Sequence, residues 1–96
     1  MVVRLFNAEA GASATSSVIT PKGQFLGTQQ LWQVTVTVAG TVTLQGRLSS
    51  DLPWVTVATT TSTAAALVQI WPEMRATLTG NTGSVDLALD VLAYSG

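Results

Sequence analysis

Apolar and polar residues alternate along three stretches of the chain, 32–38, 42–48 and 85–91. A repeat of two residues is typical of a β-strand that has one buried face and one solvated face. Valine and threonine, which are frequent in these stretches, suit the pleated surface of a half-buried sheet. The positions predicted to face the core are Trp32, Val34, Val36, Val38, Val42, Leu44, Leu48, Val85, Leu87, Leu89 and Val91.

Weaker alternation predicts further strands around these three. They are expected at 2–6, 15–20, 54–59, 64–71 and 74–79. Residues with turn chemistry separate the runs. We expect a tight hairpin joint at 39–40, a longer corner at 49–53, and a four-residue hairpin loop at 80–83.

Turns recur about every eight to twelve residues, which is typical of an all-β fold. The 96 residues of the chain suffice for one core and not for two. We therefore predict a single domain over 1–96, an antiparallel β-sandwich or jelly-roll-like barrel of about seven or eight strands. Within it, 7–17 has only small or polar side chains, so we expect a surface loop or an arm that lies along a neighbouring subunit.

The chain carries unusually little charge for a soluble domain. Charged residues make up 9% of it and the net charge is −1, whereas about a quarter of the residues in an average domain are charged. Low net charge gives weak protection against association. The 15 threonines and 8 serines can solvate much of the surface, and we expect part of the rest to be covered by other chains.

Several classes of partner are excluded by composition. The basic residues are too few and too scattered to neutralise a row of phosphates, so we expect no nucleic-acid binding. There is no cysteine, and no uninterrupted apolar run approaches the length of a membrane-spanning helix. We therefore expect no membrane partner. The first residues do not resemble a signal peptide, so we expect a protein that is made and used without export.

Catalytic residue types are also scarce. Without histidine or cysteine, neither a histidine-based triad nor a usual zinc site can be built. Asp86 and Asp90 share one face of a predicted strand, but at about 3.3 Å per residue they are roughly 13 Å apart, too far for a catalytic pair. No loop has the clustered acids of a calcium site. We expect no enzyme, no cofactor and no bound metal.

The tryptophans are the remaining candidates for a site. Trp32 is in phase with the core-facing valines, whereas Trp54 follows the 49–53 corner and Trp71 stands at the end of a strand. One interpretation makes Trp54 and Trp71 part of the core or anchors for a partner protein, because tryptophan is enriched at interfaces. The alternative is a carbohydrate-binding module in which the same two rings form a flat platform for sugars.

Two segments carry a recognisable pattern, VTLQGRLSSDLPW at 42–54 and PEMRATLTGNTGSV at 72–85. They resemble small β-sandwich virion proteins of tailed bacteriophages. In that family a strand ends in the pattern V-x-L-q-G-S-x-D-g-x-x-W-x-x-l. An alternating strand with an arginine, a glycine-asparagine hairpin and a final strand follow it. The resemblance covers about the C-terminal 55 residues and departs at 50–53, where this chain has SDLP in place of the family's serine-turn-glycine corner.

The resemblance implies a non-enzymatic structural protein of the virion, in the first place a head decoration (cement) protein. Proteins of this kind commonly form trimers over capsomer junctions and grip the major capsid protein with their termini or loops. The implied partners are further copies of this chain and the major capsid protein, in a particle assembled in the host cytoplasm. A tail, neck or fibre-base component is the nearest variant.

Particular residues are expected to act in this setting. Asp51 can cap its own turn, and Pro53 stiffens the start of the next strand. Trp54 is expected to seal the end of the core, and Arg75 to pair with Glu73 or Asp51. The residues predicted to contact partners are Trp54, Trp71, Arg75, Phe6 and Phe25.

Overall fold

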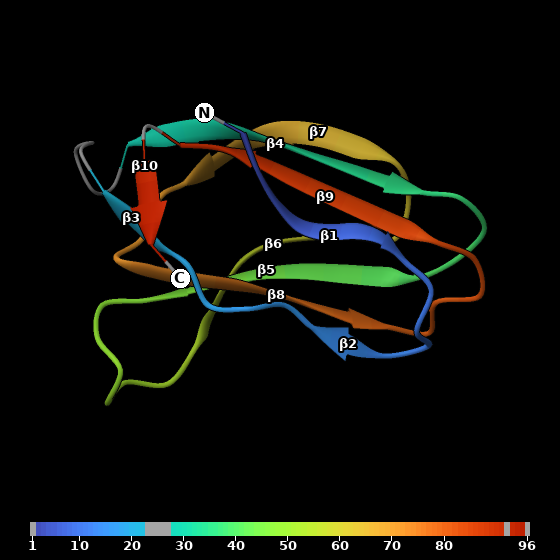
Figure 1. Ribbon diagram of the computed structural model, residues 1–96, viewed down its shortest axis with the longest axis horizontal. Helices are drawn as coiled ribbons and strands as arrows, with labels where there is room; N and C mark the ends of the chain where they lie inside the picture. The colour runs from blue at the N-terminus through green and yellow to red at the C-terminus, as the bar shows by residue number, and fades with distance from the viewer. Residues whose placement is uncertain (1, 23–27, 92, 96) are drawn as a thin grey trace.

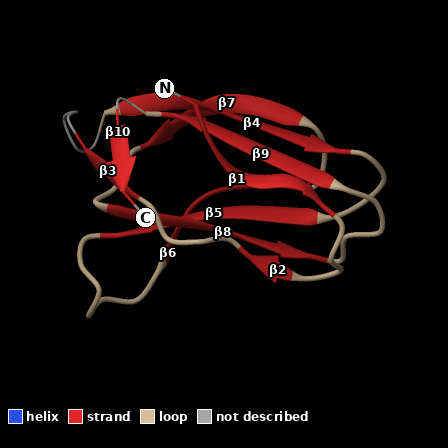
Figure 2. Cartoon of the chain, viewed as in Figure 1, coloured by secondary structure: helices blue, strands red, loops and turns tan. Residues whose placement is uncertain are grey.

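The computed structural model describes residues 2–22, 28–91 and 93–95, which form strands and turns without a helix. Figures 1 and 2 show the strands in two layers. The all-β class predicted from the sequence is therefore confirmed. The strands are β1 (Val2–Glu9), β2 (Ala14–Thr15), β3 (Thr20–Lys22), β4 (Gln29–Val36), β5 (Thr41–Arg47), β6 (Val55–Thr60), β7 (Ala64–Gln69), β8 (Glu73–Thr79), β9 (Val85–Asp90) and β10 (Ala93–Ser95).

Two four-stranded sheets face one another. The first sheet has the order β1-β9-β4-β7 and the second sheet has the order β2-β8-β5-β6. In Figure 1 the first sheet is the upper layer and the second sheet the lower one. The short strands β10 and β3 pair with each other at one end of the sandwich.

The pairing between strands is nested. β1 pairs with β9, β2 with β8, β4 with β7, and β5 with β6, and every pair is antiparallel. In this arrangement the first of eight strands pairs with the last, the second with the second to last, and so on. The eight strands thus form one long hairpin that is folded over on itself. This is the jelly roll, the double-sheet form of the predicted β-sandwich.

The core lies between the inner faces of the two sheets. Its side chains come from every second residue of the long strands, as the alternating pattern predicts. Burying each of the larger aliphatic side chains stabilises the fold by about 1.5–3 kcal/mol. The buried apolar residues are Val3, Phe6, Ile19, Trp32, Val34, Val42, Leu44, Val68, Ile70, Met74, Ala76, Leu78, Val85, Leu87, Leu89 and Val91.

Two positions that were predicted to face the core lie on the surface instead. Val38 is 71% exposed and Leu48 is 64% exposed. β4 ends at Val36 and β5 ends at Arg47, so both residues lie beyond the pleated strand that would have directed them inward. An alternating pattern predicts which sheet face a side chain lies on only for residues within the strand.

The predicted hairpins at 39–40 and 80–83 are wrong. The first connects β4 to β5 and the second connects β8 to β9, and in both cases the two strands belong to different sheets. These segments are arches that cross from one sheet to the other. The predicted corner at 49–53 does join paired strands, because β5 and β6 are neighbours in the second sheet. Glycine-rich connections look alike in a sequence whether they join paired or unpaired strands.

The 7–17 segment is held against its own domain. β1 continues to Glu9, and β2 pairs with β8. The Ser16 N–H donates to the Ala76 carbonyl at 2.8 Å, and the Ala76 N–H donates to Ser16 Oγ at 2.8 Å. The prediction of a surface loop holds for 10–13, between the two strands, and for 16–17, after β2.

One buried polar side chain, Asn81, ties the arches together at one end of the sandwich. Its Nδ2 group donates to the carbonyls of Glu9 and Gly11 at 3.0 and 2.9 Å, and its Oδ1 accepts from the Gly83 N–H at 3.1 Å. The Asn81 N–H donates to the Ala12 carbonyl. These bonds fix the turn after β1 against the arch between β8 and β9.

Candidate functional site

The outer face of the second sheet carries a tryptophan covered by two arginines. Trp54 stands just before Val55, which pairs with Gly46, so its ring lies beside β5. The guanidinium carbon of Arg47 is 4.1 Å from the centre of the indole ring, and that of Arg75 is 4.5 Å from it. We call these three residues the Trp54 stack. Trp54 is half-buried on this outer face, so the prediction that it seals the end of the core is wrong.

Each arginine of the stack is held by the residue opposite it in the sheet. Arg47 Nε donates to Glu73 Oε1 at 2.7 Å, and Arg75 Nε donates to Gln45 Oε1 at 2.8 Å. The expected pairing of Arg75 with Glu73 or Asp51 does not occur. The reason is register: Arg47 lies directly opposite Glu73, the closest position for a cross-strand ion pair.

The corner between β5 and β6 is closed by its own polar groups. Ser49 Oγ donates to the carboxylate of Asp51, and the Leu52 N–H donates to the Ser49 carbonyl at 3.2 Å. The Ser49 hydroxyl lowers the pKa of Asp51, and the backbone N–H of Asp51 and the charge of Arg47 act in the same direction. As predicted, Asp51 stabilises its own turn.

Trp71 fills a space that β5 leaves open. Gly46 faces inward beside Met74. A Cβ atom added to Gly46 would lie 2.7 Å from Cδ1 and 2.8 Å from Cβ of Trp71. The indole therefore packs directly on the backbone of β5, and Trp71 is half-buried against the core. This contact explains the glycine in the middle of a strand.

The structure brings together only some of the predicted partner-contacting residues. Trp54 and Arg75 meet in the stack, and Trp71 lies on the inner side of the same sheet. Phe6 is 4% exposed and belongs to the core. The prediction that Phe6 contacts a partner is therefore wrong, because its side chain offers no surface to another protein. Phe25 lies outside the described residues.

Sequence analysis missed an apolar pair on the outer face of the first sheet. Leu31 of β4 and Leu67 of β7 lie directly opposite each other and are 57% and 58% exposed. The signal was present in the sequence. Leu31 immediately precedes Trp32 and Leu67 immediately precedes Val68; both of these neighbours face the core, so alternation directs the leucines outward. Arg47 was also missed, because its contact with Trp54 depends on the pairing of β5 with β6.

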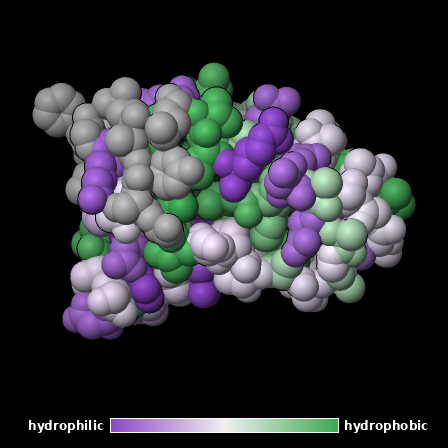
Figure 3. Space-filling model, in the orientation of Figure 1, coloured by the Kyte–Doolittle hydropathy of each residue, from purple (hydrophilic) through white to green (hydrophobic). Residues whose placement is uncertain are grey.

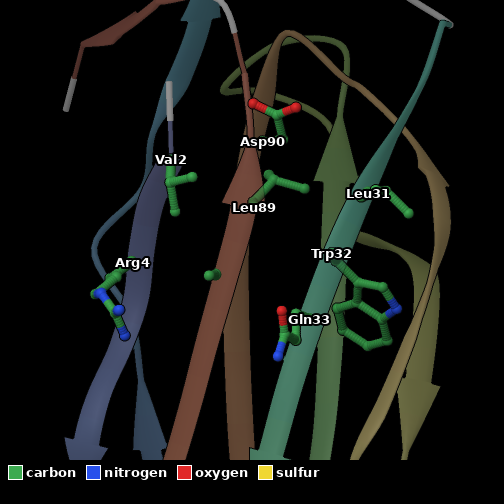
Figure 4. Close-up of a pocket in the computed structure, with 8 residues that line it drawn as sticks. Val2, Arg4, Leu31, Trp32, Gln33, Leu89 and Asp90 are labelled. Carbon is green, nitrogen blue, oxygen red and sulfur yellow. The ribbon is translucent and has the colours of Figure 1, made fainter.

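A shallow hollow of about 440 Å³ lies on the same outer face. Figure 4 shows Arg4 of β1 and Gln33 of β4 on either side of β9, with Asp90 beyond them. An ion pair between Arg4 and Asp86 spans 3.9 Å. Figure 3 shows hydrophobic and hydrophilic groups side by side on the face turned to the viewer. The hollow is open, and both polar and apolar side chains line it.

The described residues hold no group of three or more histidine, cysteine, aspartate or glutamate side chains placed to bind one metal ion. In the same residues, no helix is long and apolar enough to cross a membrane. What the described surface offers chemically is hydrogen-bonding, ionic and apolar contact.

Comparisons with family models, with curated proteins and with solved structures find no match to this chain.

Proposed function

We propose that this protein is a non-enzymatic structural protein of a tailed-phage virion, a head decoration protein that self-associates and binds the major capsid protein. The observation that carries the proposal is the outward-facing leucine pair of β4 and β7. Leu31 and Leu67 lie side by side on the outer face of the first sheet, on β4 and the edge strand β7, and both are more than half exposed. Val2, also exposed, lines the adjoining hollow.

Contiguous exposed apolar groups bounded by polar ones are typical of protein-binding surfaces. The low charge of the chain acts in the same direction, since few charged groups have to be desolvated when this face is covered. Jelly rolls are common in viral capsid proteins, although they also occur in lectins. The leucine pair, rather than the fold, favours a protein partner.

The test is co-sedimentation with capsids assembled from the major capsid protein encoded by the same genome. We expect saturable binding by the natural chain and at least about tenfold weaker binding by Leu31→Asp, because a carboxylate would have to be desolvated in the contact. Val38→Asp is the matched control: Val38 is also exposed but lies in the arch after β4, and its replacement should leave binding unchanged.

Two results would contradict the proposal. One is the absence of any saturable binding to capsids. The other is equal binding by Leu31→Asp and Val38→Asp. Saturable binding to isolated tails or necks in place of capsids would move the protein to the tail, neck or fibre-base variant.

The carbohydrate-binding alternative depended on open tryptophan rings. Trp32 is 3% exposed, Trp71 packs on Gly46, and two guanidinium groups lie over Trp54. A sugar that stacks on Trp54 would compete with the guanidinium groups that already lie over the ring. We therefore expect no change in tryptophan emission on titration with polysaccharides; a saturable shift that Trp54→Leu abolishes would favour the alternative.

A further inference from the structure

The two sheets have four edge strands, and β7 differs from the other three. β1 has two register shifts, a positive φ at Ala8 and the charged residues Arg4 and Glu9. β2 is two residues long, and β6 has a register shift opposite Leu44 and Gln45. Bulges, charges and short length are the devices by which proteins prevent edge-to-edge pairing.

β7 has none of these devices. Its six residues, Ala64–Gln69, pair with β4 in unbroken register. They include no charge and no proline, and no charged residue occurs anywhere between Asp51 and Glu73. Ala65, Ala66 and Leu67 are exposed. β7 is therefore an uncharged edge strand without a bulge.

The direction of its free backbone groups follows from the ladder. The Ile70 N–H donates to the Thr28 carbonyl at 2.9 Å, so residues 28 and 70 form a hydrogen-bonded pair. Such pairs alternate along an antiparallel ladder, which directs the N–H and C=O groups of Ala65, Leu67 and Gln69 away from β4. Within the described part of the chain, no partner is seen for these outward groups.

We propose that β7 pairs antiparallel with β7 of a second copy of this chain, with Leu67 opposite Leu67 across a two-fold axis. In this register Ala65 of each copy lies opposite Gln69 of the other, and the outward groups form about six hydrogen bonds. The two sheets then join into one continuous sheet. On its outer face, Leu67 and Leu31 of one copy adjoin the same residues of the second copy.

Two features of the strand favour a second copy as the partner. A two-fold contact brings the same surface of both copies together, so each group must tolerate its own counterpart. An uncharged strand meets no like-charge repulsion in that arrangement. The central leucine also gains an apolar neighbour where it is now more than half exposed.

Sedimentation equilibrium of the purified chain tests the pairing. A contact of this size is at the small end of specific interfaces, so we expect dimers with a dissociation constant of roughly 1–100 µM. Leu67→Lys puts two like charges next to the axis and should weaken dimerisation at least about tenfold. Val38→Lys, which adds the same charge at another exposed position, should change it less than about twofold.

A second experiment tests the register. The chain has no cysteine, so Leu67→Cys introduces a single thiol per copy. Residues opposite each other in a hydrogen-bonded antiparallel pair have Cα atoms about 5.5 Å apart. A short bis-maleimide should therefore crosslink Leu67→Cys into dimers much faster than it crosslinks Val38→Cys. Both variants replace exposed side chains, and their circular dichroism should match that of the natural chain.

The pairing is overturned by a monomer over the whole concentration range, by a trimer, or by equal behaviour of the Leu67 and Val38 variants. A trimer would agree with the family resemblance and leave the proposed virion function standing. Dimers that do not bind capsids would leave the pairing standing and remove the virion function. The two proposals are thus tested separately.

Discussion

At the scale of single residues, Asn81 has the greatest structural effect for its size. Among the described residues it is the one polar residue that is buried. Two of its side-chain hydrogen bonds connect segments about 70 residues apart in the chain, and a third closes its own turn at Gly83. Buried polar groups left without partners destabilise a fold more than the bond itself stabilises it. Asn81 therefore fixes how the arches meet.

Asn81→Ala should lower the free energy of unfolding by about 2–4 kcal/mol, because the carbonyls of Glu9 and Gly11 and the Gly83 N–H all lose their partner. Urea denaturation measures the change. Asn7→Ala, at an exposed position of β1, is the control and should stay within about 0.5 kcal/mol of the natural chain. A similar small effect for Asn81→Ala would show that the arches are held by other contacts.

Gly46 is a second position at which a small substitution should change the stability of the fold. Gly46→Ala places a methyl group against the indole of Trp71, and overpacking of this kind costs about 1–3 kcal/mol. In a Trp71→Leu background the same substitution should cost clearly less, since the smaller side chain leaves room. A thermal-unfolding double-mutant cycle measures the coupling; no coupling between the two sites would contradict the contact.

At the scale of elements, the corner between β5 and β6 provides a pH-dependent test. The Ser49 hydroxyl, the backbone N–H of Asp51 and the charge of Arg47 hold the pKa of Asp51 below its usual value of 3.8. A carboxylate whose pKa is lowered on folding stabilises the folded state above its unfolded pKa, and this contribution is lost as the pH falls through the lower, folded pKa.

The Asp51 carboxyl resonance should therefore titrate with a midpoint below 3.8 in a pH series followed by nuclear magnetic resonance. Ser49→Ala removes the largest cause and should move the midpoint back toward the usual value. Ser50→Ala, one residue further along the exposed corner, should leave it unchanged. A midpoint at or above 3.8 in the natural chain would contradict the hydrogen bond.

The strands themselves were largely predictable from the sequence, because burial of one face imposes a repeat of two residues. Val85, Leu87, Leu89 and Val91 all face the core as expected. Prediction failed where pairing between distant segments decides the outcome. The connections at 39–40 and 80–83 look like hairpins, yet each joins strands of different sheets.

The contacts of Trp54 could not be predicted from the sequence for a related reason. The register shift between β5 and β6 puts Thr56 opposite Gln45 but Ala58 opposite Leu44, so simple alternation does not give the facing side of this strand. The contact with Arg47 and Arg75 depends on the same register. The contact of Trp54 with the two arginines is therefore apparent only once the order of strands in the sheet is known.

At the scale of the whole molecule, the domain is a jelly roll whose two outer faces have different character. The second sheet presents the Trp54 stack, whose two arginines already donate hydrogen bonds to Glu73 and Gln45 within the domain. The first sheet presents exposed leucines next to an open edge strand. We propose that the first sheet carries the surface through which this protein contacts its partners.

Hydrogen exchange, compared between dilute protein and protein saturated on capsids, tests this claim most directly. In the dilute monomer the outward N–H groups of Ala65, Leu67 and Gln69 lack a partner and should exchange rapidly. On capsids we predict slowed exchange in 64–69 and in the neighbouring strand at 29–36, with little change in 45–54. Unchanged exchange in 64–69 and 29–36, with protection confined to the Trp54 stack, would contradict the account.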